Sequence, residues 1–285
     1  MTSIVQQQGP QGTTEYTLGN RTPKRKYSLH IGRFFALDGS LGAPVSVDVS
    51  KPHVILIAGK RGYGKSYTLG VLLEEFKRLS ESVRKNYSCV VIDTLGIFWT
   101  LNYPNKKQKE LLSQWNLSEK KTPIQLLHTS KDFPKVYQDI EEINQLQFPP
   151  SLLSVNQWCQ LFQFSPVQPE GMILSSSILS LQSQGKNFSL NDIKNEIHKD
   201  NNVKKETIQT VENCLMIARS WNLFSKTATP FSTLIKPGKI TIVDLSFIQS
   251  THLKQIITGI IAELLFYYRI NHRKIEEFQK ITQEE

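Results

Sequence analysis

Residues 53–76, HVILIAGKRGYGKSYTLGVLLEEF, join an apolar run, a glycine-rich turn and the start of a helix. Residues 59–66 fit the pattern G-x-x-x-x-G-K-[ST], in which glycines let successive backbone N–H groups converge on phosphate oxygens. The apolar residues over 69–76 recur at helical spacing, which supplies the strand, loop and helix that this chemistry requires. The stretch therefore predicts an α/β nucleotide-binding core.

Each residue of this loop has an expected role. Lys65 reaches the β- and γ-phosphates of ATP, and the Ser66 hydroxyl is the candidate ligand for Mg²⁺. For Arg61, a contact with the γ-phosphate or a neighbouring subunit and simple filling of the loop stay as alternatives; for Tyr63 and Tyr67, a contact with ribose or base is weighed against the same filling role. The predicted nucleotide-binding residues are Gly59, Lys60, Arg61, Gly62, Tyr63, Gly64, Lys65, Ser66 and Tyr67.

Hydrolysis also needs an acid at the end of a second strand, followed in many such enzymes by a glutamate. Two predicted strands end in aspartate, CVVID at Asp93 and ITIVD at Asp244, and neither is followed by glutamate. Each acid could support Mg²⁺ through a water, or could cap its strand end. The catalytic residues are therefore unassigned, with Asp93 and Asp244 as candidates. The glutamates of the charged tail, Glu276, Glu277, Glu284 and Glu285, read as solvated surface.

The chain divides into five predicted segments. They are a disordered polar tail (1–26), a short β lead-in (27–52), the loop-bearing half of the core (53–134), a helical insertion (135–235), and a further core strand with a long helix (236–285). Ser189 with Asp192 predicts a helix N-terminus within the insertion, and Thr251 is the expected cap of the last helix.

Composition narrows the cellular setting. No apolar run approaches the roughly 20 residues that span a bilayer, and the first residues have no signal-peptide pattern, so neither membrane nor export is expected. The three cysteines are far apart, which favours reduced thiols and a cytoplasmic protein. The net charge of +9 suits a partner such as nucleic acid, although solvated charges of the tail and loops are the favoured explanation of it. The six histidines have no ligand spacing, so Mg²⁺ is the one metal expected.

Three stretches together resemble the HerA-like ATPases of the HerA–FtsK superfamily. They are the lead-in with its loop (IGRFFALDG through GKRGYGKSYTLG), the strand end DTLGIFW, and GKITIVDLS before a long apolar helix. The resemblance implies a RecA-like motor core, a ring that is usually a hexamer with ATP between subunits, and translocation of double-stranded DNA, in some cases beside a nuclease partner. It carries Gly59, Gly62, Gly64, Lys65 and Ser66 over as phosphate-loop residues, and it places Asp93 at the family's aspartate after the second strand.

The chain also departs from the family pattern. Family members have a hydrophobic strand ending in Asp-Glu after the long helix, and they have an arginine finger and an N-terminal barrel; here the first two are not found and only a remnant of the barrel is expected. We therefore predict a RecA-like P-loop core with a mostly parallel sheet, a helical insertion and a short β lead-in, without the C-terminal part of the core.

Three functions follow as hypotheses. The leading one is an ATP-hydrolysing, DNA-translocating ring motor of the HerA type, completed by the segment with the Asp-Glu strand. The alternative is a nucleotide-binding regulatory or assembly protein that hydrolyses little or no ATP because this strand is absent. A small-molecule kinase fits the loop but not the helical insertion.

Overall fold

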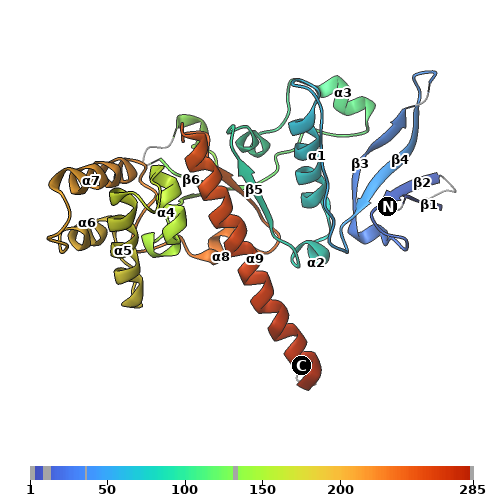
Figure 1. The fold of residues 1–285 in the computed structure, drawn as a ribbon. Helices are drawn as coiled ribbons and strands as arrows, with labels where there is room; N and C mark the ends of the chain where they lie inside the picture. Colours follow the sequence, from blue (N-terminus) through green and yellow to red (C-terminus); the bar gives the residue numbers. More distant parts are fainter. Residues whose placement is uncertain (1–3, 9–13, 36, 131–133, 283–285) are drawn as a thin grey trace.

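Figure 1 shows the fold of the chain, a computed structural model that describes residues 4–8, 14–35, 37–130 and 134–282. A small sheet at the N-terminal end, a parallel sheet in the middle and a group of helices at the other end lie in a row. The last helix crosses the middle of the molecule and projects away from it.

The N-terminal sheet has four strands in the order β1-β2-β4-β3, namely β1 (Ile4–Gln8), β2 (Thr14–Leu18), β4 (Leu41–Asp48) and β3 (Ser28–Phe35). β2 pairs with β1 antiparallel and with β4 parallel. The expectation of a disordered tail over residues 1–26 is therefore wrong where the structure describes it. Strands of polar composition can form here because backbone bonds to a neighbouring strand hold them, and the pairing buries Thr17.

The central sheet is parallel throughout and has the order β5-β8-β6-β7. Its strands are β5 (Cys89–Asp93), β8 (Ile240–Asp244), β6 (Gln125–His128) and β7 (Glu142–Gln145). The predicted strands CVVID and ITIVD are confirmed, and every residue of β8 is buried, as a continuous apolar run in a parallel sheet should be. β7 was not predicted, because its short sequence EINQ has no apolar run.

The apolar run before the loop differs from expectation. Residues 53–58 belong to no strand, and most of their apolar side chains face solvent: the exposed fraction is 101% for Val54 and 87% for Leu56, and Ile57 is half-buried. Sequence patterning predicts a buried parallel strand, but a strand exists only where a neighbour supplies backbone partners. None of the residues that the structure describes pairs with this run.

One group of helices follows the loop at 59–66, and a second group forms the insertion. The loop leads into α1 (Lys65–Arg78), followed by α2 (Glu81–Arg84), the 3₁₀ turn η3 (Phe98–Asn102) and α3 (Lys109–Gln114). The insertion adds the 3₁₀ turns η4 (Lys135–Tyr137) and η5 (Pro150–Leu152) and the helices α4 (Val155–Phe162), α5 (Pro169–Ser183), α6 (Leu190–Ile197), α7 (Lys205–Ser220) and α8 (Phe231–Leu234).

The insertion shares one apolar core with a face of the central sheet and the first half of the last helix. Trp158 is completely buried there, and its indole N–H donates to the carbonyl of Pro150 at 3.2 Å. The helix start predicted at Ser189 is confirmed as a capping box: the Ser189 hydroxyl accepts from the amide of Asp192, whose carboxylate accepts from the amide of Ser189. The same arrangement begins α4 at Ser154.

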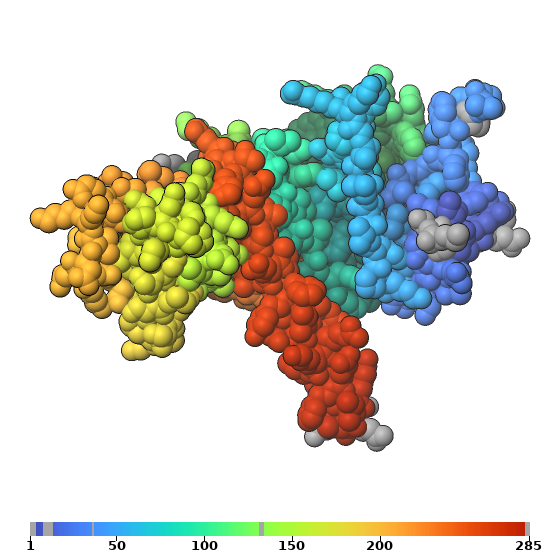
Figure 2. All heavy atoms as spheres, in the orientation of Figure 1, coloured from blue at the N-terminus to red at the C-terminus, as the bar shows by residue number. Residues whose placement is uncertain are grey.

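The first half of the last helix, α9 (Thr251–Thr282), packs against the core of the chain, and its second half projects away from it. Ser250, not Thr251, caps it, because the Ser250 hydroxyl accepts from the amide of Leu253 at 3.2 Å. Leu253, Ile256, Ile257, Ile260 and Ile261 are the buried residues of the first half. Figure 2 shows the second half standing clear of the rest of the chain.

Candidate functional site

The loop between residues 59 and 66 has the backbone shape that phosphate binding requires. Gly62 and Gly64 adopt the left-handed conformation, with φ of 87° and 76°, and Gly64 is the residue that precedes α1. A residue with a side chain is strained in this conformation, which explains glycine at both positions. The amides of Gly62, Gly64, Lys65 and Ser66 have no acceptor among the described residues, so they are available to an anion at the positive end of α1.

Lys65 lies over this loop. Its ammonium donates to the backbone carbonyl of Lys60 at 2.8 Å, so the long side chain folds back across the turn. Phosphate oxygens would be better acceptors for a cation than this carbonyl. Ser66 is exposed, and no hydrogen bond of its hydroxyl to a described residue is present. These residues fit the triphosphate and Mg²⁺ that the sequence predicts.

The side chains around the loop point outward into solvent. The exposed fraction is 78% for Tyr63 and 61% for Tyr67, and Lys60 and Arg61 are exposed as well. Neither tyrosine ring contacts another ring among the described aromatic residues. The fold therefore brings all nine predicted loop residues together at one surface, and the contacts of Arg61, Tyr63 and Tyr67 with a nucleotide stay predictions.

Asp93 serves as a cap for the DTLG turn. Its Oδ1 accepts from the amides of Leu95 at 3.2 Å and Gly96 at 2.8 Å, and its Oδ2 accepts from the amides of Ile97 at 2.7 Å and Phe98 at 2.8 Å. A carboxylate has about four acceptor positions, so this turn uses all of them. In this structure, Asp93 has no lone pair left for a metal or its waters.

Asp244 lies beside Asp93, because β5 and β8 pair in parallel with these residues opposite each other. The Tyr137 hydroxyl donates to Asp244 Oδ2 at 2.6 Å, and the Ser246 amide donates to Oδ1 at 2.8 Å. Burial, and then the hydrogen bond to Asp244, raise the pKa of Tyr137 well above its usual range, so the phenol keeps its proton and donates. Asp244 is buried and has a structural partner on each oxygen.

Sequence reasoning missed Tyr137 and His128 in this cluster. His128 ends β6 opposite Asp244, and burial lowers the pKa of its imidazole. Its place at a strand end was a usable signal; Tyr137 offered none, since it is 107 residues from Asp244. Among the described residues, no group of three His, Cys, Asp or Glu side chains could hold a metal ion.

Gly96 makes the close approach of the two strand ends possible. Its φ is 67°, and a Cβ atom placed on it would lie 2.5 Å from Ser246 Oγ. We expect Gly96→Ala to lower the free energy of unfolding by about 2–4 kcal/mol, from the left-handed backbone and the overlap together. Chemical denaturation measures this change.

The control for this prediction is Gly39→Ala. Gly39 has a φ of 83° but nothing within 4 Å of an added Cβ, so only backbone strain applies there. If the two variants lose equal stability, the contact with Ser246 contributes nothing and the prediction for Gly96 is wrong.

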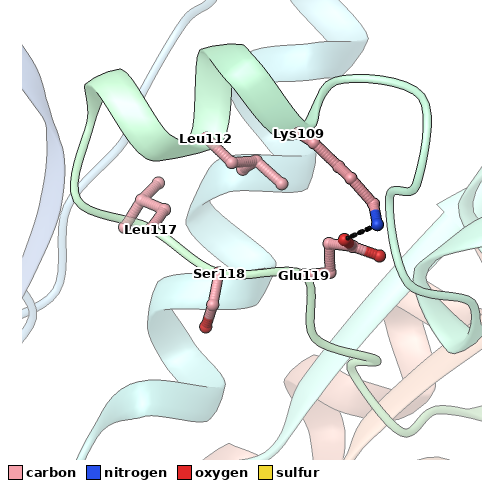
Figure 3. Close-up of a pocket in the computed structure, with 5 residues that line it drawn as sticks. All are labelled: Lys109, Leu112, Leu117, Ser118 and Glu119. Carbon is pink, nitrogen blue, oxygen red and sulfur yellow. Dashed lines mark ion pairs between the residues drawn. The ribbon is translucent and has the colours of Figure 1, made fainter.

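A surface pocket lies beside α3, separate from the loop. Figure 3 shows its lining residues, Lys109, Leu112, Leu117, Ser118 and Glu119, with an ion pair of 2.9 Å between the Lys109 ammonium and the Glu119 carboxylate. It contains none of the predicted nucleotide-binding residues and no group of catalytic side chains.

A family model described as the central domain of the helicase HerA matches residues 29–265. The chain belongs to this family. The match includes the loop at 59–66, the DTLG turn and β8, so the chain is a HerA-like P-loop ATPase domain with the mixed α/β fold and parallel sheet expected of a RecA-like core.

Other comparisons add less to this HerA-family assignment. A search of curated proteins found no match. Among solved structures, VirB4 of Thermoanaerobacter pseudethanolicus matches with 13% identity and a TM-score of 0.43, over 90% of this chain and 65% of that chain. In the parts of the chain that the structure describes, no helix has both the length and the apolar composition needed to cross a bilayer.

Proposed function

We propose that this chain is the ATP-binding part of a ring-shaped motor that hydrolyses ATP and moves double-stranded DNA. The observation that carries the proposal is the loop at 59–66, with its left-handed glycines, its free amides and Lys65 folded over the turn, in a chain of the HerA family. Mg²⁺ would neutralise charge that develops on the β- and γ-phosphates. Lys65 would bind the phosphate oxygens and Ser66 would hold the metal.

The exposure of the loop supports binding between subunits. Arg61 and Tyr63 stand in solvent beside the candidate phosphate site, where a second copy of the chain could contact the nucleotide. The net charge of +9 supports DNA as the partner, because lysine and arginine neutralise backbone phosphates. A homo-oligomeric ring, a nuclease partner and a cytoplasmic location belong to the same proposal.

A specific observation favours the second candidate, a nucleotide-binding protein with little hydrolysis. Asp93 is saturated by four amides, and Asp244 is held by Tyr137 and Ser246. Asp93 is therefore not free to position a metal or an attacking water, and Asp244 keeps one acceptor position on each oxygen. Efficient hydrolysis would then depend on an acid other than Asp93.

Steady-state ATPase assays with and without duplex DNA distinguish the two candidates. For a motor, we expect turnover that rises several-fold with duplex DNA, and sedimentation should show a ring in the presence of nucleotide. Measurable ATP binding with turnover at background, with or without DNA, would reject the motor and support the second candidate. Absence of ATP binding would reject both.

A further inference from the structure

The four strands of the central sheet are parallel, so all of them begin at one end of the sheet and finish at the other. Asp93 and Asp244 are the last residues of β5 and β8 and lie at the carboxyl end. Lys239 directly precedes β8 and Glu142 begins β7, so both lie at the amino end. Figure 1 shows α2 at this amino end, at the far end of α1 from the loop at 59–66. The amino end is therefore a surface separate from the candidate nucleotide site.

Positive side chains from three parts of the chain meet at the amino end. The Arg84 guanidinium donates to the carbonyls of Lys77 at 2.7 Å and Leu79 at 3.2 Å, which holds α2 against the end of α1. A Cβ atom placed on Gly238 would lie 3.6 Å from Arg84 Nε, so the guanidinium also lies against the turn before β8. Burial, and then the charges of Arg84 and Lys239, lower the pKa of the Lys77 ammonium. Lys77, Arg84 and Lys239 therefore stand close together.

A single carboxylate balances part of this positive charge. Glu142 Oε2 pairs with Lys236 at 2.7 Å, and Glu142 Oε1 pairs with Lys239 at 3.0 Å. Within the described parts of the chain, the Lys77 ammonium has neither a hydrogen bond nor an ion pair. We call Lys77, Arg84, Lys236 and Lys239 the amino-end cluster. Its four cations share one carboxylate, and a half-buried ammonium without an acceptor is stabilised by an added anion.

The positive charge continues from the amino-end cluster toward the N-terminal sheet. The basic run RTPKRK at 21–26 directly precedes Tyr27, and the Lys26 ammonium lies 5.0 Å from the centre of the Tyr27 ring. Tyr27 and Tyr87 pack against the same apolar cluster, and the Tyr87 carbonyl accepts from the amide of Gly238 at 2.8 Å. The two tyrosines thus connect the basic run to the turn before β8, and cations extend across the whole of this surface.

We propose that the amino-end cluster binds backbone phosphates of duplex DNA and that the run at 21–26 extends the contact along the same duplex. The choice of DNA rests on the proposed function. A duplex carries a regular row of phosphates, which suits cations that are spread over several elements. A protein partner would need apolar anchors, and residues 21–27, 77–87 and 236–239 contain no exposed large apolar side chain. Contacts to phosphates read no bases, so this binding is independent of DNA sequence.

Fluorescence anisotropy of a labelled duplex tests the site on the full 285-residue protein, without nucleotide and over a series of salt concentrations. The variant is Lys77→Gln with Lys239→Gln, which removes one ammonium without a bond and one that shares Glu142 with Lys236. We expect its affinity to fall by about tenfold or more at low salt, and the slope of log K against log salt to fall by about two.

The matched control is Lys204→Gln with Lys205→Gln, which removes two charges from exposed residues where α7 begins in the insertion. Its affinity and its salt slope should equal those of the unaltered protein. Equal losses in the two double variants would assign the effect to overall charge and overturn the proposal.

Acylation of lysine amines in the unaltered protein, located by mass spectrometry, gives a second test that needs no substitution. The duplex should slow acylation of Lys77 and Lys239 several-fold and leave that of Lys204 unchanged. Tripolyphosphate at the same phosphate concentration should protect far less, because it reaches fewer of the cations. Equal protection by tripolyphosphate would make this a site for small anions and reject the duplex.

The failure of this inference can be told apart from the failure of the proposed function. If the unaltered protein binds duplex and the variant at Lys77 and Lys239 keeps the same affinity and slope, this inference alone is wrong. If the unaltered protein binds no duplex at low salt, both the DNA-moving function and this inference are wrong.

Discussion

Replacing Lys65 by alanine should weaken ATP binding by roughly 100-fold or more while the fold stays intact. The ammonium makes two charge-assisted contacts with phosphates in the proposed complex, each worth about 1.5–3 kcal/mol, and 1.4 kcal/mol corresponds to a factor of ten. In the structure it makes a single bond, to the Lys60 carbonyl, so its removal leaves the packing unchanged. Isothermal titration with ATP and Mg²⁺ measures the affinity, and a melting curve measures the stability of the fold.

The matched control for this prediction is Lys85→Ala, which removes the same charge from the exposed end of α2. Its ATP affinity should equal that of the unaltered protein. If both variants lost affinity equally, the effect would come from overall charge, and the assignment of Lys65 to the phosphates would fail.

Asp93→Ala should produce the largest loss of stability among the site variants, about 3 kcal/mol or more. The substitution removes the acceptor of four backbone amides, of which the Phe98 amide makes a buried bond and the other three make part-buried bonds, and an amide that loses its acceptor away from water pays the cost of desolvation. The loss should appear in denaturation curves recorded without nucleotide or Mg²⁺, because the four bonds belong to the protein itself.

Asp38→Ala is the control, since Asp38 caps an exposed turn through the amide of Ser40 at 2.9 Å. It should lower the free energy of unfolding far less than Asp93→Ala does, because its turn is open to water. An Asp93→Ala protein of unchanged stability that has lost Mg²⁺-dependent ATP binding would show instead that Asp93 serves the metal.

The loop and the strands of the central sheet could be predicted from sequence because their signals are local. The glycine pattern at 59–66 requires particular backbone angles at particular residues, and continuous apolar runs such as ITIVD are typical of parallel strands wherever they lie. The capping box at Ser189 is local in the same sense. The two polar strands of the N-terminal sheet were missed, because backbone pairing of β1 with β2 and of β2 with β4 holds them, and not an apolar pattern.

The roles of the two strand-end acids could not be predicted, since they depend on residues distant in sequence. Tyr137 reaches Asp244 from the insertion, and the register of β5 against β8 brings Ser246 to Gly96. Only the folded chain shows that Asp93 is used by its own turn.

By itself, the sequence determined that the chain has a phosphate-binding loop, since residues 59–66 contain all the backbone freedom and charge that the loop needs. Tertiary structure alone decided which apolar run becomes a strand. Residues 53–58 and β8 have similar apolar character, yet β8 is buried between two neighbours and 53–58 is exposed. The physical reason is that a strand is stabilised by its neighbours, and neighbours are brought together only when the whole chain folds.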